Sequence, residues 1–222
     1  IVAIRNLLFW IGILPEKKYN IPIISVGNLS AGGTGKTPQI EYLVRLLSSN
    51  YRVAILSRGY KRKTKGFIEV LKTHSSTAVG DEPLQYKHKF PTLTIAVHES
   101  RTKGIDALLR MAPAPEVILL DDAFQHRWVK PGLSILLTDF HQLYSNDYML
   151  PSGTLREFQI GAKRADIIII TKTPTVYSPI VYRNLIEELE PTEYQKVYCS
   201  FIRYKPMVAL ADETLNISEE GL

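Results

Sequence analysis

The feature that most constrains this chain is a glycine-rich octapeptide near its start, Ser30-Ala31-Gly32-Gly33-Thr34-Gly35-Lys36-Thr37. An apolar run at 21–26 predicts a buried strand before it, and the residues from about 35 to 49 predict a helix after it. Pro38 falls in the first turn of that helix, where a missing N–H costs little. Strand, glycine-rich turn and helix in this order let backbone N–H groups converge on an anion. The octapeptide therefore predicts a phosphate-binding loop.

Each residue type in this loop has a physical task. Glycine leaves the backbone N–H groups open to phosphate oxygens, because no Cβ stands in the way. The Lys36 ammonium can bridge the β- and γ-phosphates of a nucleoside triphosphate, and the Thr37 hydroxyl can ligate Mg²⁺. Ser30 departs from the G-x-x-x-x-G-K-[ST] pattern, which has glycine at that position. The residues expected to contact nucleotide are Ser30, Ala31, Gly32, Gly33, Thr34, Gly35, Lys36 and Thr37.

A pair of acids, Asp121 and Asp122, follows the apolar run 117–120. Many hydrophobic strands end in Asp at a surface turn, so the pair alone is ambiguous. With the glycine-rich loop upstream, it fits a magnesium site, because Thr37 alone cannot hold the ion. The predicted metal ligands are Thr37, Asp121, Asp122 and Glu82.

Two further acids, Asp81 and Glu82, follow Gly80 at the start of a predicted helix. One interpretation is simple capping, since acids are favoured at helix N-termini. The other makes Asp81 the group that accepts a proton from an acceptor hydroxyl, with Glu82 assisting at the metal. Phosphoryl transfer needs positioning and charge neutralisation more than covalent help from the protein. The catalytic candidates are Asp81, Lys36 and Glu82.

Several polar residues are candidates for substrate contacts. Gln125 and His126 follow the 117–120 strand, where parallel α/β sheets bind ligands. Arg58 opens a basic segment, 58–72, that is expected to form a hairpin holding an anion or lying free in solvent. Arg101 stands at a predicted helix start and could equally be a surface arginine. The predicted substrate-contacting residues are Arg58, Arg101, Gln125, His126 and Arg156, the last in a proline–glycine loop at 150–157.

The remaining pattern alternates strands with helices, which predicts an α/β fold. The further strands are expected at 53–56, 92–97, 117–120, 133–137 and 167–170, and the further helices at 82–89, 101–111 and 179–190. Runs this apolar are typical of strands buried on both faces. We therefore expect a mostly parallel, doubly wound sheet flanked by helices. Thr171 and Lys172, after the last of these strands, are expected near a bound base.

The amino-acid composition limits the kinds of ligand and partner that this chain can bind. The 222 residues include one cysteine, which excludes disulfides within the chain and multi-cysteine metal sites and fits a reducing, cytoplasmic compartment. The net charge is +5, but no predicted helix carries a long basic stripe. This favours an anionic ligand or membrane surface over nucleic acid. No protein partner is indicated.

The first fourteen residues are nearly all apolar, yet too few to span a bilayer, which needs roughly 20. They predict either a helix packed on its own domain or an interfacial helix. In the interfacial case Phe9 and Trp10 dip into lipid, and Arg5, Lys17 and Lys18 meet headgroups. We expect a membrane-contacting segment at 1–20, a core domain at 21–205, and at 206–222 the truncated start of a C-terminal region.

Six motifs occur in order between about 21 and 202. They are V-G-N-L-S-A-G-G-T-G-K-T-P at 26–38, L-S-R-G-Y at 56–60, V-G-D-E-P at 79–83, D-D-A-F-Q-H-R at 121–127, L-P-S-G-T-L-R-E at 150–157 and K-R-A-D at 163–166. Together they resemble the tetraacyldisaccharide 4′-kinase family of P-loop NTPases. That family's loop at this position is led by Ser or Thr, which accounts for Ser30.

The resemblance implies a specific activity: ATP-dependent phosphorylation, with Mg²⁺, of the 4′-hydroxyl of tetraacyldisaccharide 1-phosphate in lipid A biosynthesis. It also implies a peripheral or monotopic place on the cytoplasmic face of the bacterial inner membrane. It strengthens Asp81 as catalytic acid/base and supports Glu82, Asp121 and Asp122 around metal and nucleotide.

Two other classes stay open from the residues alone. A partitioning-type ATPase switch shares the loop and the sheet, but such proteins usually carry a signature lysine where this chain has Ala31. A nucleotide-binding membrane module without chemistry is the other. Nucleotide hydrolysis with and without an acylated disaccharide separates these classes from a kinase.

Overall fold

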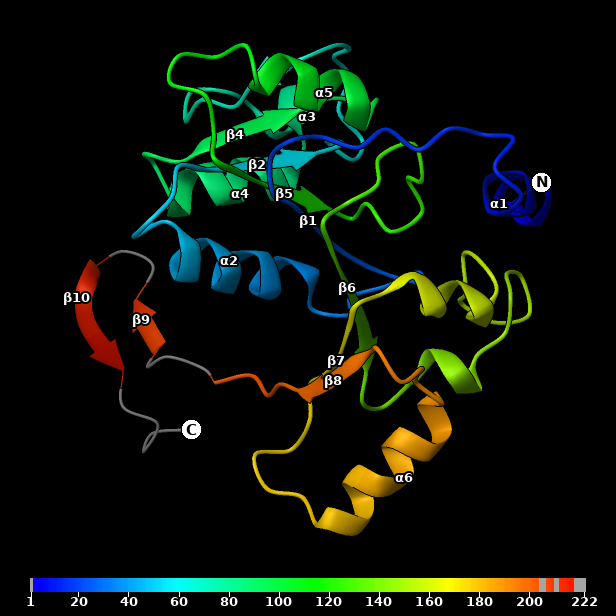
Figure 1. The fold of residues 1–222 in the computed structure, drawn as a ribbon. Helices are drawn as coiled ribbons and strands as arrows, with labels where there is room; N and C mark the ends of the chain where they lie inside the picture. Colours follow the sequence, from blue (N-terminus) through cyan, green and yellow to red (C-terminus); the bar gives the residue numbers. More distant parts are fainter. Residues whose placement is uncertain (1, 204–206, 210–211, 218–222) are drawn as a thin grey trace.

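The computed structural model describes residues 2–203, 207–209 and 212–217. Its centre is an eight-stranded sheet in the order β3-β4-β2-β5-β1-β6-β7-β8, parallel throughout except for the edge strand β3 (Figure 1). The strands are β1 (Ile23–Asn28), β2 (Val53–Ser57), β3 (Ile68–Glu69), β4 (Thr94–Val97), β5 (Val117–Asp121), β6 (Leu133–Asp139), β7 (Ile167–Thr171) and β8 (Lys196–Cys199). A separate antiparallel pair consists of β9 (Met207–Ala209) and β10 (Asp212–Ile217).

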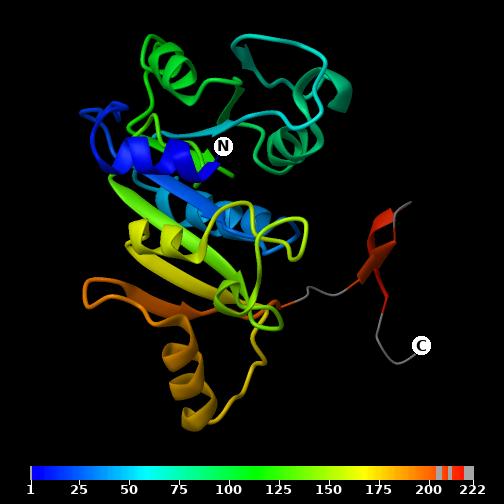
Figure 2. The same cartoon turned by 90° about the vertical axis from the view of Figure 1, so that its right-hand side faces the viewer.

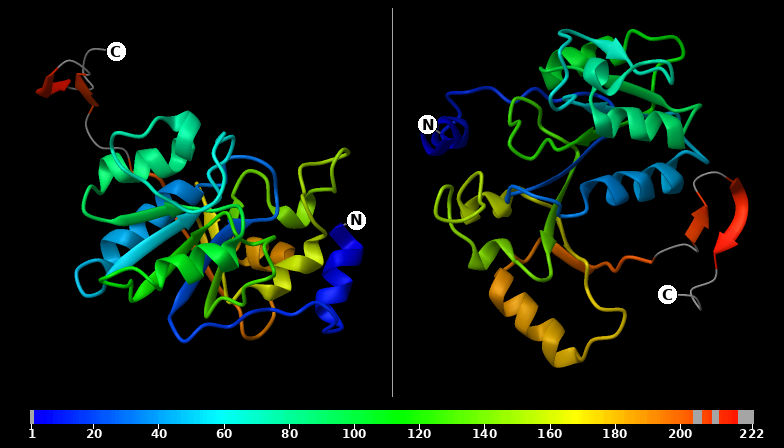
Figure 3. Two further views of the ribbon diagram at one scale, coloured as in Figure 1. Left: turned by 90° about the horizontal axis from the view of Figure 1, so that it is seen from above. Right: turned by 180° about the vertical axis from the view of Figure 1, so that it is seen from behind.

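Helices cover both faces of the large sheet, as Figures 1 and 3 show. One face carries α2 (Lys36–Leu47), α3 (Ser76–Val79) and α4 (Asp81–Lys89), and the other carries α5 (Arg101–Leu108), α6 (Pro179–Leu189) and the 3₁₀ turns η1 (Tyr144–Asn146) and η2 (Gln159–Arg164). Side chains alternate across β2: Val53 and Ile55 pack with α2, whereas Ala54 and Leu56 pack with α5. The predicted doubly wound α/β fold is confirmed.

Most predicted elements lie within two or three residues of their observed bounds. The strand β8 escaped prediction because its residues alternate between exposed and half-buried positions and form no apolar run. The two 3₁₀ turns escaped for a similar reason, since three to six residues carry little periodicity.

The predicted basic hairpin at 58–72 is wrong. Only Ile68 and Glu69 form a strand, and this strand pairs with β4 rather than within the segment. The Arg62 guanidinium donates to the Gly66 carbonyl (2.8 Å) and to the Glu99 carboxylate (2.5 Å). These side-chain bonds fold the segment into turns and take the place of strand pairing.

The N-terminal apolar helix is present as α1 (Val2–Trp10). Phe9 is buried, as in the interpretation of a helix packed on its own domain, and does not face lipid: its ring lies 5.0 Å from the Trp128 ring in an edge arrangement, and the Arg127 guanidinium lies over the Phe9 ring. Trp10, in contrast, is 81% exposed. Lys17 is ion-paired with Asp106 at 2.7 Å. Among the residues described here, no helix is long and apolar enough to cross a bilayer.

The helix α1 lies beside the loops that follow β6 (Figure 2). The Asn6 amide donates to the Glu157 carboxylate at 2.9 Å, and the Arg127 guanidinium donates to the Asn6 carbonyl at 2.9 Å. The proposed division into 1–20, 21–205 and 206–222 stays a prediction, and much of its last part lies outside the described residues.

Candidate functional site: a phosphate loop at the carboxyl edge of the sheet

The glycine-rich loop connects β1 to α2 at the carboxyl edge of the central strands. Just before it, Gly27 lies so close to the turn after β5 that a Cβ there would stand 2.7 Å from the Phe124 Cβ and 2.9 Å from the Phe124 nitrogen. Any larger residue would therefore separate the loop from Asp121 and Asp122. This close approach holds the predicted phosphate loop and the predicted acids together.

The loop at 150–157 braces the phosphate loop. The Ala31 N–H donates to the Thr154 carbonyl at 2.7 Å, and the Arg156 N–H donates to the Leu29 carbonyl at 2.8 Å. Asp147 fixes the bracing loop in turn, because its carboxylate accepts from the Thr154 N–H at 3.0 Å. The sequence pointed to the 150–157 loop, but this bracing role depends on contacts that only the fold brings together.

Lys36 points back toward the end of β1. Its ammonium donates to the Asn28 side-chain oxygen at 3.2 Å and lies 3.7 Å from the nearer Asp122 carboxylate oxygen. The Arg156 guanidinium contacts the same Asn28 oxygen and the Asn28 carbonyl, the latter at 3.1 Å. Asn28 thus links two cations at the site, and sequence analysis missed it. Its signals were a polar residue at the end of an apolar strand and its place in the motif at 26–38, neither of which indicates this role.

Asp121 is a buried carboxylate whose two oxygens have no hydrogen-bond partner among the described residues. Burial, assisted by the negative charge of Glu82, raises the pKa of Asp121 to about 7, against the opposing charge of Arg101. An unpartnered buried carboxylate is costly unless a cation completes it. The arrangement therefore fits a magnesium ion.

Asp122 differs from its neighbour. It forms a two-pronged ion pair with Arg156, with distances of 3.0 and 2.9 Å. Burial alone would raise the pKa of Asp122, but the Arg156 hydrogen bond and the Lys36 charge hold it below its usual value. Asp122 is therefore an ionised anchor for the two cations, and its predicted role as a metal ligand remains a prediction.

The part of the chain with described side chains contains no group of three or more His, Cys, Asp or Glu that could hold a metal unaided. Mg²⁺ commonly binds through one or two carboxylates together with phosphate oxygens and water. Thr37 lies in the first turn of α2 and Asp121 ends β5, so these two of the predicted ligands fit such a partial set best.

Asp81 and Glu82 form the first turn of α4. The preceding Gly80 has a positive φ of 95° and packs against Gly59, where a Cβ on Gly80 would stand 3.0 Å from the Gly59 Cα. This contact places the turn that follows Arg58 beside Asp81. Asp81 is exposed, whereas Glu82 is half-buried and near enough to Asp121 to raise its pKa.

Arg101 is not a surface arginine, which was one of its two interpretations. It is 3% exposed, and its guanidinium donates to the Asp121 carbonyl at 2.5 Å and to the His98 carbonyl at 3.4 Å. Burial lowers the pKa of Arg101 to about 10, so it stays charged at neutral pH. In this structure Arg101 holds the end of β5, and contact with substrate remains a prediction.

Gln125 and His126 both lie at the site. The Gln125 amide donates to the Asn28 carbonyl at 2.8 Å and to the Glu157 carboxylate at 3.1 Å. Burial, with the charges of Arg101 and Arg58, lowers the pKa of His126 to about 4, so His126 is neutral at pH 7. Glu157, which sequence analysis did not single out as a site residue, is buried and also pairs with Arg164 at 2.9 Å.

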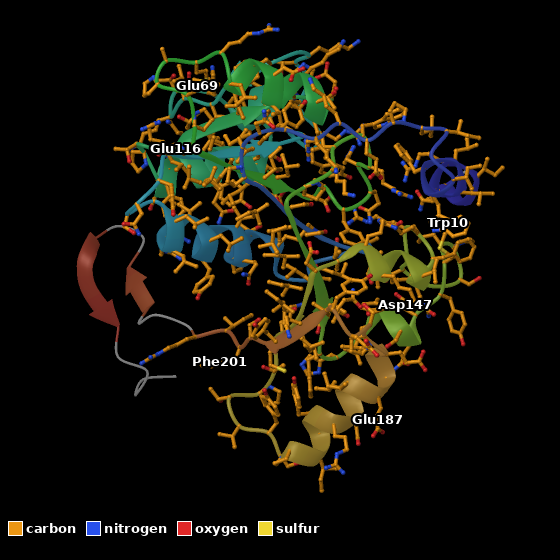
Figure 4. All side chains as sticks on the ribbon, in the orientation of Figure 1. Trp10, Glu69, Glu116, Asp147, Glu187 and Phe201 are labelled. Carbon is orange, nitrogen blue, oxygen red and sulfur yellow. The ribbon has the colours of Figure 1, made fainter. Side chains whose placement is uncertain are left out.

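Thr171 and Lys172 lie at one end of a groove of about 830 Å³ between α2 and the strands β6 to β8. The groove runs from Gly35 and Pro38, next to the phosphate loop, to Phe201. Figure 4 shows Phe201 beyond the end of β8. The Thr171 hydroxyl donates to the Thr34 carbonyl at 3.0 Å. This end of the groove therefore adjoins the phosphate loop, and the expectation that Thr171 and Lys172 lie near a bound base stays a prediction.

A parallel sheet with a glycine-rich loop after β1, Lys36 and Thr37 opening α2, and an acid ending β5 defines the class of P-loop nucleotide-binding proteins. The comparison with known families narrows this class. The profile of the family described as tetraacyldisaccharide-1-P 4′-kinase matches residues 1–211, and the chain belongs to that family.

Individual relatives agree. The tetraacyldisaccharide 4′-kinase of Flavobacterium psychrophilum is 51% identical over 221 residues, which cover 99% of this chain and 64% of that protein. The enzyme of the same name from Bacteroides thetaiotaomicron is 51% identical over 205 residues, covering 92% of this chain and 54% of the relative. This chain therefore spans about three fifths of the length of these curated relatives.

A solved structure shares the fold closely. LpxK from Aquifex aeolicus, crystallised in complex with ATP, superposes with a TM-score of 0.71 at 31% sequence identity. The superposition covers 99% of this chain and 81% of that one.

Proposed function

We propose that this chain carries the ATP-binding and catalytic core of an enzyme that transfers the γ-phosphate of ATP to the 4′-hydroxyl of tetraacyldisaccharide 1-phosphate. One observation carries the proposal: Lys36, Asp121 and Asp122 meet around the glycine-rich loop of a chain from this family. The names of its relatives and the ATP complex of the Aquifex protein support the choice of substrates.

The proposed nucleotide site uses the backbone of residues 30–37 for the phosphates and the Lys36 ammonium for the β- and γ-phosphate charge. Magnesium, when bound, neutralises part of the negative charge on those phosphates. Thr37 and Asp121 are the residues best placed to hold it, with Glu82 and Asp122 nearby. Lys36 would exchange its present contact with Asn28 for the triphosphate.

In the proposed transfer the 4′-hydroxyl oxygen forms a bond to the γ-phosphorus, and the bond from that phosphorus to the oxygen leaving with ADP breaks. Asp81 takes the hydroxyl proton. Its exposed place at the start of α4 leaves it accessible to an acceptor molecule. Arg101 does not move a proton in this scheme, since it stays charged at neutral pH.

A basic cavity supports a site for the acceptor's own phosphate. Its volume is about 670 Å³, and it lies along the turns after β2, beside the contact between Gly59 and Gly80. The cations that line it are Arg58, Lys61, Arg62 and Lys65. Arg62 already forms an ion pair with Glu99. The proposed phosphate contacts are therefore Arg58, Lys61 and Lys65.

The proposed membrane surface combines α1 with the neighbouring loops. Its exposed apolar residues are Ile4, Leu7, Trp10, Ile11 and Ile13 near the N-terminus, and Tyr148, Leu150, Phe158 and Ile160 in the loops. The bond between Asn6 and Glu157 ties the two groups together, and Figure 4 labels Trp10 next to α1, on the side toward these loops. Exposed apolar and aromatic residues of this kind fit an interfacial contact with an anionic inner membrane, on its cytoplasmic face.

The test is phosphate transfer from ATP with and without the acylated disaccharide 1-phosphate. We expect ADP to form only when the acceptor is present, together with a product that carries one additional phosphate. Hydrolysis of ATP at the same rate without acceptor would contradict the kinase proposal and favour the switch. Failure to bind ATP at all would contradict the nucleotide site itself.

A further inference from the structure

Tyr86, on α4, is a core residue with a polar atom that packing does not explain. Its side chain is fully buried in the cluster formed by α2, α4 and the sheet. Its hydroxyl has no hydrogen-bond partner among the described residues. A phenylalanine would fill almost the same space without burying an unpaired hydroxyl, so the oxygen needs a separate account.

The surroundings of this hydroxyl belong to the proposed magnesium site. Glu82 lies one helical turn before Tyr86 on α4, so the two share a face of the helix. The Thr37 hydroxyl lies close enough to the phenol to interact with it, although the pair does not meet hydrogen-bond geometry in this structure. The nearby negative charges are those of Asp121, Glu82 and Glu41. Burial, followed by the charge of Asp121, raises the pKa of Tyr86, so the phenol stays protonated and can donate.

Other buried polar atoms near the phenol also lack partners among the described residues. The two carboxylate oxygens of Asp121 lack partners, as the Tyr86 hydroxyl does. The hydroxyl can donate and the carboxylate can only accept, yet they make no direct bond. A water molecule between them would satisfy both, and Mg²⁺ in phosphate sites keeps several waters of its own.

We propose that Tyr86 is a positioning residue of the magnesium site, whose hydroxyl hydrogen-bonds to the water shell of the ion held by Thr37 and Asp121. The inference rests on the proposed function, because it takes the nucleotide site as given. It adds a contact from α4, the helix that also carries Asp81 and Glu82. Magnesium binding would thereby fix the start of that helix, where the acceptor proton is taken.

The experiment compares Tyr86→Phe with Tyr144→Phe. Tyr144 is the matched control, since it is also a buried tyrosine, but it lies in the other cluster and donates to the Leu189 carbonyl at 3.4 Å. ATP binding to each protein is measured by calorimetry, without acceptor, across a magnesium titration and again in excess EDTA. Melting temperatures without nucleotide report on folding.

We expect Tyr86→Phe to raise the magnesium concentration for half-maximal ATP binding by roughly three- to ten-fold, the usual effect of losing one hydrogen bond. Affinity in EDTA should not change, and the ligand-free protein should melt no lower than the wild type. Tyr144→Phe should leave the magnesium dependence unchanged.

The outcomes separate two failures. If Tyr86→Phe and wild type share one magnesium dependence, the tyrosine is core filling and this inference is wrong, while the nucleotide site stands. If wild-type ATP binding itself ignores magnesium, the metal site of the proposed function fails first. If Tyr86→Phe lost the same ATP affinity in EDTA as in magnesium, Tyr86 would stabilise the phosphate loop rather than the metal site. That result would also overturn the inference.

Discussion

Replacing Asp121 with asparagine should make the ligand-free protein more stable at neutral and alkaline pH, although the same change should remove magnesium-dependent ATP binding. The reason is that Asp121 is buried, unpartnered and beside two other acids. Asparagine keeps the shape of the side chain and removes the buried charge. The site therefore contains a residue that serves the ligand at the expense of the fold.

The magnitude follows from the pKa of Asp121, which rises from 3.8 to about 7 on folding. At about 1.4 kcal/mol for each pH unit, ionisation in the folded protein is of order 4 kcal/mol less favourable than in the unfolded chain. Because the folded-state pKa is raised, the protonated carboxyl stabilises the fold fully below the unfolded value. That contribution is lost as the pH rises through about 7.

The assay is urea unfolding of wild type and Asp121→Asn at pH 8.5 and at pH 5.5, without nucleotide. We expect the variant to be more stable by about 4 kcal/mol at pH 8.5 and by about half as much at pH 5.5. Asp122→Asn is the matched control, for which we expect a change in unfolding free energy of the opposite sign. The reason is that pairing with Arg156 lowers the pKa of Asp122. It should destabilise the protein at both pH values.

Two results would refute this reasoning. One is an Asp121→Asn variant that is less stable than wild type at pH 8.5. The other is a gain in stability that does not depend on pH, which would mean that the charge of Asp121 is not its source.

Three further predictions address the loop, the acid and the packing. Lys36→Ala should abolish measurable turnover, because the γ-phosphate loses its charge partner; a wild-type rate in a coupled ADP assay would exclude Lys36 from the mechanism. Asp81→Ala should lower kcat by about 10²-fold or more, with little change in the KM for ATP. If only the affinity for nucleotide changed, Asp81 would not be the proton acceptor. Gly27→Ala should lower the free energy of unfolding in urea by about 1–3 kcal/mol, since the added Cβ would lie 2.7 Å from the Phe124 Cβ. Gly33→Ala is the control and should lower it far less, because nothing lies within 4 Å of the added Cβ. Equal losses in the two variants would contradict the close approach of Gly27 to Phe124.

Sequence reasoning succeeded where the signal is local. The glycine-rich loop, Asp121 and Asp122 at a strand end, and Asp81 and Glu82 at a helix start each occupy a few consecutive residues. Parallel topology gathers the carboxyl ends of neighbouring strands at one edge, which brings together the loop after β1 and the acids at the end of β5. Asp81 and Glu82 follow no strand, and their roles stay predictions. The fold class followed from the same apolar runs.

It fell short where a role depends on residues far apart in the chain. Asn28 and Arg156 are 128 positions apart, yet they bond directly, and nothing near either residue indicates the other. Arg101 carries no local sign that its guanidinium is buried under the end of β5. In the basic segment, charge and turn residues suggested a hairpin, but Arg62 bonds to Glu99, 37 positions away, and the segment folds into turns.

The account depends on one arrangement in space, and a crystal structure of this chain with magnesium and a non-hydrolysable ATP analogue tests it directly. We predict a triphosphate held by the backbone amides of Gly33 and Gly35 and by the Lys36 ammonium, with magnesium between the Thr37 hydroxyl and Asp121. Two results would contradict this arrangement. One is a nucleotide bound elsewhere, and the other is a nucleotide in this loop whose metal contacts Asp121 neither directly nor through water.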